Sequence, residues 1–313
     1  MHNNQQLDSA KATEKVALKT FDGIPRMPAL FGRQPGPRQR PDRNEGYPAK
    51  GASTLASWVV ARADANALKT LLPVGFTLAE PLLIVEAVSL SNLPWLAGRG
   101  YEMLMVSVPV TYRNGDLEQQ GRLELVTWED CPDAILSGRE ELGWNKVYAD
   151  TMKRHSGNDG KSVRYIASWG GTRFFDMEIT LKCLPGIPGS WRKGPLMHYR
   201  VLPRTGAWGE LEVEQVTAAP AMVPLTSMRS LKGGIGCFRF YPATFEQLPT
   251  LAHVVNRLAA IQLVEVVDAG QAQVAAWTRL HDMQVLSSTS PIPFVANRPI
   301  ESDDETFDQE VPS

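Results

Sequence analysis

Apolar and polar positions alternate over several stretches of the chain, which predicts β-strands. Residues 54–63 (TLASWVVARA) and 101–113 (YEMLMVSVPVTYR) show this pattern, and the apolar run 81–90 (PLLIVEAVSL) is a strand candidate between them. The stretch 101–113 leads into Asn114-Gly115, a dipeptide favoured in tight hairpin turns. Residues 121–130 (GRLELVTWED) are therefore expected to return antiparallel beside it.

Later stretches continue the strand pattern. Residues 163–184 predict two strands around a Gly170-Gly171 turn, and residues 197–203 and 208–223 predict two more. Because the connections are too short for repeated strand–helix–strand crossovers, we expect a mainly antiparallel sheet.

Three short helices are expected around these strands. Asp64 is a suitable N-cap for a helix over residues 65–72. Residues 131–143 predict a second helix, with a proline in its first turn and a glycine near its end. Residues 273–282 (QVAAWTRLHD) predict a third, amphipathic one. The expected fold class is α+β, with a mainly antiparallel curved sheet or barrel and a few flanking helices; such sheets often hold a ligand.

Composition divides the chain into three regions. Residues 1–50 are rich in proline and arginine and are expected to form an extended arm, which could alternatively wrap around a neighbouring subunit. Residues 51–290 contain no low-complexity linker or internal repeat and should form one domain. Residues 291–313 are acidic and are expected to be a disordered tail.

The overall charge argues against two classes of partner. The formal net charge is −2, with 43% hydrophobic and 21% charged residues, so nothing favours binding to nucleic acid or to an anionic membrane. The sequence has no signal-peptide pattern and no apolar run near the roughly 20 residues that span a bilayer, so a cytoplasmic protein is expected. The three cysteines are sparse, and each is expected to be a small buried apolar residue.

Common catalytic motifs are missing from the sequence. It has no phosphate-loop, HExxH or GxSxG pattern, and no two histidines have metal-ligand spacing. Neither a cofactor nor a metal is therefore expected. The GGIGC fragment at Gly233 is expected to be a turn, and His198 is either an active-site base or a hydrogen-bonded strand histidine.

Charged residues inside apolar runs are better candidates for chemistry. Glu86 lies within the run 81–90, and buried charges usually have either a partner or a task. Its alternative is a structural ion pair, for which Arg139 is a candidate. Glu102 follows Tyr101 at the start of the next strand, and its alternative is a solvated strand-end carboxylate.

Lys146 is the candidate nucleophile. It follows Trp144 and precedes Val147, so burial there would remove solvation from its charge and favour the neutral amine. A neutral amine is what imine formation with a carbonyl compound requires. The alternative is an exposed lysine after a helix.

The segments IVEAVSL, GYEMLMVSVPVTYRNG, WEDCPDAILSGREELGWNK and MHYRVLPRTGAWGELEVEQVTAAP, in this order, resemble the acetoacetate decarboxylase family. The similarity covers about residues 52–285 and leaves out the arm and the tail. It implies a mostly antiparallel, cone-like β-barrel, a homo-oligomer, and a lysine that forms a Schiff base with a small keto acid. Acetoacetate decarboxylase is itself the standard example of a lysine activated beside another cationic group, so this logic comes with the resemblance.

The resemblance assigns roles to individual residues. Lys146 matches the Schiff-base lysine, Glu86 the first active-site glutamate and Glu102 the second, after a loop about two residues longer than usual. Arg139 and Glu140 match a Gly-Arg-Glu signature in which Arg139 would hold carboxylates in place. Supporting positions are expected at Tyr101 and Trp144.

Two departures from the family pattern affect the expected reaction. Family decarboxylases have a second lysine after the nucleophile, where this chain has Val147, and an arginine that meets the substrate carboxylate, where it has a residue near Thr54. Three hypotheses follow: an imine-forming lyase with aldolase or dehydratase chemistry, a β-keto acid decarboxylase using the same lysine, and a non-catalytic ligand-binding relative.

Overall fold

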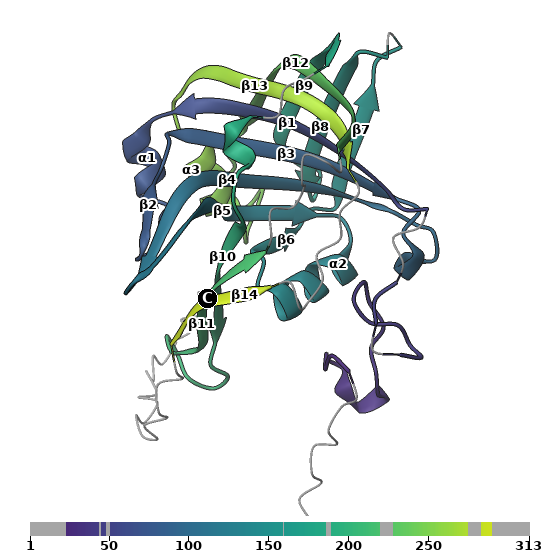
Figure 1. The fold of residues 1–313 in the computed structure, drawn as a ribbon, viewed down its shortest axis with the longest axis vertical. Coiled ribbons are helices and arrows are strands. Elements are labelled where there is room, and N and C mark those ends of the chain that lie inside the picture. The colour runs from purple at the N-terminus through teal and green to yellow at the C-terminus, as the bar shows by residue number, and fades with distance from the viewer. Residues whose placement is uncertain are drawn as a thin grey trace, which may run out of the picture.

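A computed structural model describes residues 23–43, 45–47, 51–158, 160–185, 189–219, 228–274 and 283–289. One large curved sheet dominates the fold (Figure 1). Its strands are hydrogen-bonded in the order β14-β11-β10-β5-β4-β3-β1-β13-β12-β9-β8-β7, with β2 on β4 and β6 on β5. The strands are β1 (Ser53–Ala63), β2 (Phe76–Leu78), β3 (Leu82–Ser91), β4 (Tyr101–Asn114), β5 (Leu117–Glu129), β6 (Lys146–Tyr148), β7 (Thr151–Ser156), β8 (Ser162–Trp169), β9 (Thr172–Pro185), β10 (Leu196–Pro203), β11 (Leu211–Ala219), β12 (Met228–Phe240), β13 (Leu263–Val274) and β14 (Gln284–Thr289).

The predicted fold class is confirmed. Most neighbouring strands are antiparallel, and β5 makes parallel pairs with both β6 and β10. Within the described residues the sheet is curved and does not close into a complete barrel, because its path ends at β14 and β7. The predicted hairpin is also present, although its turn is Gly115-Asp116, one residue later than expected, because Asn114 still pairs with Leu117.

Strand alternation gives the sheet two apolar faces. The larger core cluster includes Val85, Ala87, Leu104 and Val106, together with buried residues of β8, β9 and the late helix α3. The second cluster includes Trp58, Met105 and Trp144, together with Leu142, Trp191 and Leu196. The candidate nucleophile lies on the face of this second cluster.

The helices are few and short. They are α1 (Ala65–Lys69), α2 (Pro132–Ser137) and α3 (Ala252–Ala259), with the single turns η1 (Ala29–Phe31), η2 (Pro94–Leu96), η3 (Gly138–Leu142) and η4 (Ser190–Arg192). The predicted N-cap is confirmed, because the Asp64 side chain accepts hydrogen bonds from the amides of Asn66 and Ala67. The predicted helix over residues 131–143 is also present, although it continues beyond Ser137 as the π-helical turn η3.

Two secondary-structure expectations are corrected. Gln273 and Val274 belong to β13, while residues 275–282 of the expected amphipathic helix lie outside the described residues. The GGIGC fragment was expected to be a turn, but it lies inside β12, where residues 234–237 pair with β9. Long-range strand pairing therefore outweighs the local turn preference of its glycines.

The cysteines differ from one another in exposure. Cys237 is exposed rather than buried, because its side chain leaves the sheet on the solvent side, and Cys131 is half-buried. The side chain of Cys183 lies outside the described part. The expectation of three buried cysteines is therefore wrong for Cys237.

No helix in the described chain is long and apolar enough to cross a membrane.

Candidate active site

Lys146 begins β6, and its side chain is buried. The strand pairs in parallel with β5, with Lys146 opposite Thr127. The Nζ atom lies 2.7 Å from Oε1 of Glu129 and 3.3 Å from the main-chain oxygen of Ala134, to which it donates. It also lies 5.1 Å from the ring centroid of Trp144, within cation–π range. The exposed-lysine alternative is therefore wrong.

Gly138 makes room for the lysine side chain. A Cβ at this position would lie 2.6 Å from both Cδ and Cε of Lys146 and 2.8 Å from Nζ. Gly138 also begins η3, which Gly143 ends with a left-handed φ of 79°. Isolated π-helical turns are frequent at functional sites. The turn thus lets helix α2 run directly over the amine.

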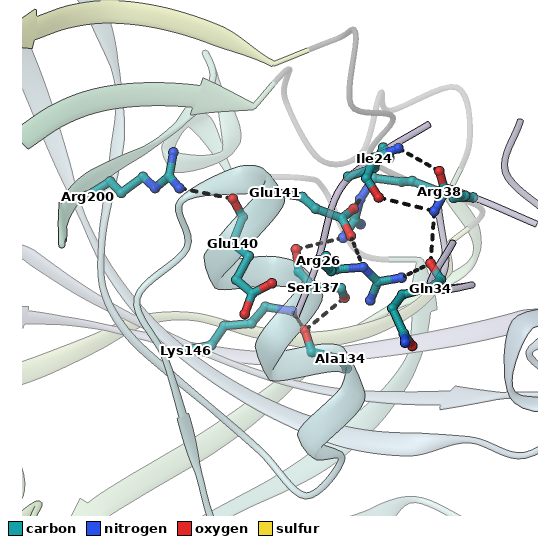
Figure 2. A network of polar contacts seen from close by, with 11 residues as sticks. Ile24, Arg26, Gln34, Arg38, Ala134, Ser137, Glu140, Glu141, Lys146 and Arg200 are labelled. Carbon is teal, nitrogen blue, oxygen red and sulfur yellow. Dashed lines mark hydrogen bonds and ion pairs between the residues drawn. The ribbon is translucent and has the colours of Figure 1, made fainter. Parts of the chain in front are cut away.

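Arg139 and Glu140, the two charged residues of the Gly-Arg-Glu signature, each take part in a hydrogen bond to a main-chain oxygen. The Arg139 Nη1 atom donates to the carbonyl oxygen of Lys146 at 2.8 Å. The carbonyl oxygen of Glu140 accepts from Arg200 at 3.0 Å (Figure 2). Arg139 therefore holds the strand that carries Lys146.

Glu129 is the carboxylate that contacts Lys146. Its side chain is fully buried, at 0% exposure, so desolvation raises its pKa, while the nearby ammonium of Lys146 acts in the opposite direction. Tyr101 lies close enough for the Glu129 charge to influence it, and burial raises the pKa of the Tyr101 phenol well above its usual value. Lys146 and Glu129 form a buried pair able to exchange a proton.

Glu124 anchors the chain just before Lys146. Its Oε2 accepts from the main-chain amide of Asn145 at 2.9 Å, and Thr127 donates to its Oε1. Nδ1 of His198 lies 2.5 Å from Oε2, and neither side chain is exposed. These contacts lower the pKa of Glu124 against the effect of burial, with the charge of His198 the largest contribution among them.

His198 also stacks on Trp144. The ring centroids are 4.8 Å apart, with an interplanar angle of 22°. Nε2 of His198 and Nε1 of Trp144 are buried, and neither has a hydrogen-bond partner within the described structure. These two buried nitrogens therefore have no protein partner in the described part of the chain.

Glu86 forms an ion pair, but with different partners from the one expected. Its carboxylate lies 2.5 Å from Nη1 of Arg122 and 3.3 Å from Nη1 of Arg192. Burial would raise the pKa of Glu86, but the two guanidinium groups outweigh it and hold the pKa below its usual value. Arg139 binds the carbonyl oxygen of Lys146 instead, so the expectation of a Glu86–Arg139 pair is wrong.

Glu102 lies on the other face of the sheet. Strand β3 pairs with β4 so that Glu86 is opposite Met105 and Ser89 is opposite Glu102. Glu86 and Glu102 therefore point to opposite sides. Glu102 lines a small pocket with apolar residues of the larger core, where burial raises its pKa to about 7 even though Ser89 donates to it at 2.6 Å. Direct proton transfer between Glu102 and Lys146 would have to cross the sheet.

Part of the arm packs on its own chain. Arg26 and Arg38 form ion pairs of 3.0 and 2.5 Å with the two carboxylate oxygens of Glu141 in η3. Arg38 also donates to the carbonyl oxygen of Ser137 at 2.9 Å. Figure 2 shows the arm residues beside the helical segment that contains Ala134, whose carbonyl oxygen accepts a hydrogen bond from Lys146. The arm therefore braces the turn that covers the lysine.

Metal ligation has no support in the described residues. No group of three or more histidine, cysteine, aspartate or glutamate side chains there could hold a metal ion. The buried carboxylates of Glu86, Glu129 and Glu124 are paired with arginine, lysine and histidine, respectively.

A protein-family model described as acetoacetate decarboxylase matches residues 34–274. The chain belongs to the acetoacetate decarboxylase family. This confirms the resemblance, and the low identities below make the chain a divergent member. A search of curated proteins gave no match.

Solved structures of the acetoacetate decarboxylase fold are similar to this chain. The acetoacetate decarboxylase of Legionella pneumophila is 19% identical, with a TM-score of 0.56, over 82% of this chain and 93% of that one. The enduracididine biosynthesis enzyme MppR, complexed with the condensation product of pyruvate and imidazole 4-carboxaldehyde, is 16% identical, with a TM-score of 0.59 over 75% and 88%. An acetoacetate decarboxylase-like enzyme from Sphingomonas wittichii is 20% identical, with a TM-score of 0.52 over 73% and 90%. At these identities, the comparison shows that the chain shares the fold of these proteins.

In this member of the acetoacetate decarboxylase family, the sequence did not point to the residues that contact the expected site residues. Glu129 stands next to Asp130 and Cys131 in an acid-rich segment, and its place at the end of a predicted strand was its only signal. Glu124 lies in the same strand and gave no signal of its own. Arg192 follows Trp191 in a loop-like stretch, and only its three-dimensional pairing with Glu86 makes it notable.

Proposed function

We propose that this protein is a Schiff-base-forming lyase acting on a small 2-oxo acid or ketone, with Lys146 as the nucleophile. The observation that carries the proposal is the buried pair of Lys146 and Glu129, 2.7 Å apart beneath the turn at Gly138. Membership of the acetoacetate decarboxylase family supports the reaction class.

The pair can supply the neutral amine that carbonyl attack requires. Transfer of one proton from the Lys146 ammonium to the Glu129 carboxylate gives an amine and a carboxylic acid, and the raised pKa of Glu129 makes this transfer less costly. The amine attacks the carbonyl carbon, and the acid gives its proton to the oxygen to form a hydroxyl. A second proton moves from the attacking nitrogen through the Glu129 carboxylate to this hydroxyl, which leaves as water. One ketone and one ammonium thus become one protonated imine and one water.

Glu129 then acts a second time. As a carboxylate, it removes a proton from the carbon next to the protonated imine, and the electron pair of that C–H bond gives an enamine. The enamine carbon can form a bond to an aldehyde, or a β-hydroxyl can leave as water. Nε2 of His198 and Nε1 of Trp144 are buried nitrogens that can bind the oxygen of the second reactant.

Two observations favour aldol or dehydration chemistry over decarboxylation. Val147 packs against the larger core, so its position faces away from Lys146 and supplies no second amine. Thr54, on β1, supplies no cation for a carboxylate next to the reacting carbon. The fold also resembles MppR, whose structure contains a condensation product of pyruvate with an aldehyde.

Product analysis tests this proposal. The protein is incubated with pyruvate and an aromatic aldehyde, and separately with acetoacetate, and condensation product and carbon dioxide are measured. We expect condensation that disappears in Lys146→Ala. Carbon dioxide release from acetoacetate that depends on Lys146, without condensation, would instead identify a decarboxylase. The absence of both products across a panel of carbonyl compounds would favour the non-catalytic binding relative.

A further inference from the structure

A second buried cation lies on the same face of the sheet as Lys146. Arg192 belongs to η4, and its side chain is 7% exposed. Its guanidinium carbon lies 4.2 Å from the ring centroids of both Trp58 and Trp191. These rings hold the guanidinium plane in position, and stacked arginine of this kind is well suited to bidentate recognition.

The hydrogen bonds of Arg192 leave one edge of its guanidinium without a protein partner. Nη1 is occupied by Glu86 at 3.3 Å. Nε and Nη2 are buried, and neither has a hydrogen-bond partner among the residues described. Their N–H groups point the same way along one edge of the group, which is the fork that matches the two oxygens of a carboxylate.

Two acids, Glu86 and Asp268, lie near Arg192, and neither is hydrogen-bonded to that edge. Glu86 already bridges Arg122 and Arg192. Oδ2 of Asp268 accepts from the indole nitrogens of Trp58 at 3.1 Å and Trp191 at 2.7 Å. Buried charged donors without partners are costly, so a fork of this kind is best matched by an anion that comes with a ligand.

The fork and the amine share one apolar surface. Glu86, Met105, Thr127 and Lys146 are successive register partners across β3, β4, β5 and β6. Their side chains therefore leave the sheet on one face, and the outer two are separated by strand spacings that sum to about 14 Å. Met103 and Met105 lie between the ends in the cluster that also contains Trp144 and Trp191. Methionine side chains adapt readily to a methylene chain.

We propose that the Nε–Nη2 edge of Arg192 binds a carboxylate at the far end of the substrate. The substrate is then an oxo acid in which several methylene groups separate this carboxylate from the carbonyl carbon that meets Lys146. This inference rests on the proposed Schiff-base chemistry for the position of the carbonyl. The carboxylate bound by Arg192 is remote from the reacting carbon. It differs in this way from the carboxylate next to the reacting carbon that the family arginine meets.

Binding without any carbonyl tests the arginine site by itself. The melting temperature of the protein is measured with hexanoate and with hexanol. Hexanoate should raise it more than hexanol does, and Arg192→Lys should remove this difference because lysine keeps the charge but lacks the fork. The exposed Arg113→Lys is the control and should retain the difference. Equal effects of hexanoate and hexanol in the wild type would overturn the proposal.

The second measurement includes the amine. Rates of borohydride trapping on Lys146 are compared for 6-oxoheptanoate and 2-heptanone, which differ in the terminal carboxylate. The wild-type rate ratio should favour the oxo acid by about tenfold to a hundredfold, and Arg192→Lys should lower that ratio toward one. A ratio that is unchanged in Arg192→Lys would contradict the assignment. One combined outcome separates the two proposals: hexanoate binds through Arg192, but no carbonyl compound is trapped on Lys146. The carboxylate site at Arg192 would then be supported. The Schiff-base proposal, and the oxo-acid substrate that depends on it, would be wrong.

Discussion

The ammonium of Lys146 and the carboxylate of Glu129 lie 2.7 Å apart in a site where neither side chain is more than 9% exposed. They come from parallel neighbours, since β6 pairs with β5 at Thr127, two residues before Glu129. Burial raises the pKa of Glu129 and thereby lowers the cost of a neutral pair. On the proposed function, this relationship assigns Glu129 as the acid–base partner of the amine.

Replacing Glu129 by glutamine should slow imine formation strongly. The variant keeps the shape of the side chain but cannot accept the proton of the Lys146 ammonium, so we expect the rate of adduct formation at neutral pH to fall by about a hundredfold to ten-thousandfold. Single-turnover borohydride trapping measures this rate. Glu118→Gln, at an exposed ion pair, is the control. A Glu129→Gln rate equal to that of the control would show that another group handles the proton.

Adding one methyl group at Gly138 should displace the lysine. The new Cβ would lie 2.6 Å from Cδ and Cε of Lys146, which is too close for carbon atoms in contact. Because alanine is compatible with helical backbone, we expect Gly138→Ala to fold while losing most of its trapping rate. Leu136→Ala, on the exposed side of the same helix, is the matched control. Normal trapping in Gly138→Ala would mean that the helix does not hold the amine in place.

Glu102 predicts a pH dependence of stability that is separate from catalysis. Its pKa is raised from 4.5 to about 7, so the folded state binds its proton more tightly than the unfolded state does. The associated stability is complete below the unfolded pKa and is lost as pH rises through the folded pKa. Glu102→Gln should therefore gain stability relative to wild type between about pH 5 and about pH 8, as measured by urea unfolding. A difference that does not change with pH would contradict this.

The arm should contribute to stability through Glu141. Its side chain is 2% exposed and pairs with Arg26 and Arg38. Breaking a buried ion pair from one side costs about 3–5 kcal/mol, so Glu141→Gln should lower the free energy of unfolding by up to that amount. The variant should also be cut more rapidly within residues 23–43 by a protease. Unfolding and cleavage indistinguishable from those of Glu118→Gln would mean that the arm is not anchored there.

The local elements of this fold could be predicted from sequence because their signals are local. The hairpin of β4 and β5 follows from alternation and from Asn114-Gly115, and the first helix follows from Asp64. The hairpin and helix inferences needed only neighbouring residues. For the lysine, the flanking Trp144 and Val147 left an exposed residue as the alternative, and the resemblance to the family singled it out.

The contacts of the candidate site depend on pairing between distant strands. Glu129 meets Lys146 because β5 and β6 pair in parallel, which no short sequence window shows. Glu86 meets Arg122 and Arg192 for the same kind of reason, so the Arg139 partner suggested by its place in the sequence was wrong. The face that Glu102 occupies depends on the register of β3 against β4, where a shift of one residue would reverse it.

Covalent chemistry at the Lys146 amine is the central claim, and adduct mapping tests it most directly. The protein is incubated with a panel of 2-oxo acids and ketones, reduced with borohydride, digested and analysed by peptide mass spectrometry. We predict a reduced adduct on Lys146, absent without a carbonyl compound and absent in Lys146→Ala. Adducts on other lysines alone, or no adduct with any member of the panel, would contradict the proposed Schiff base.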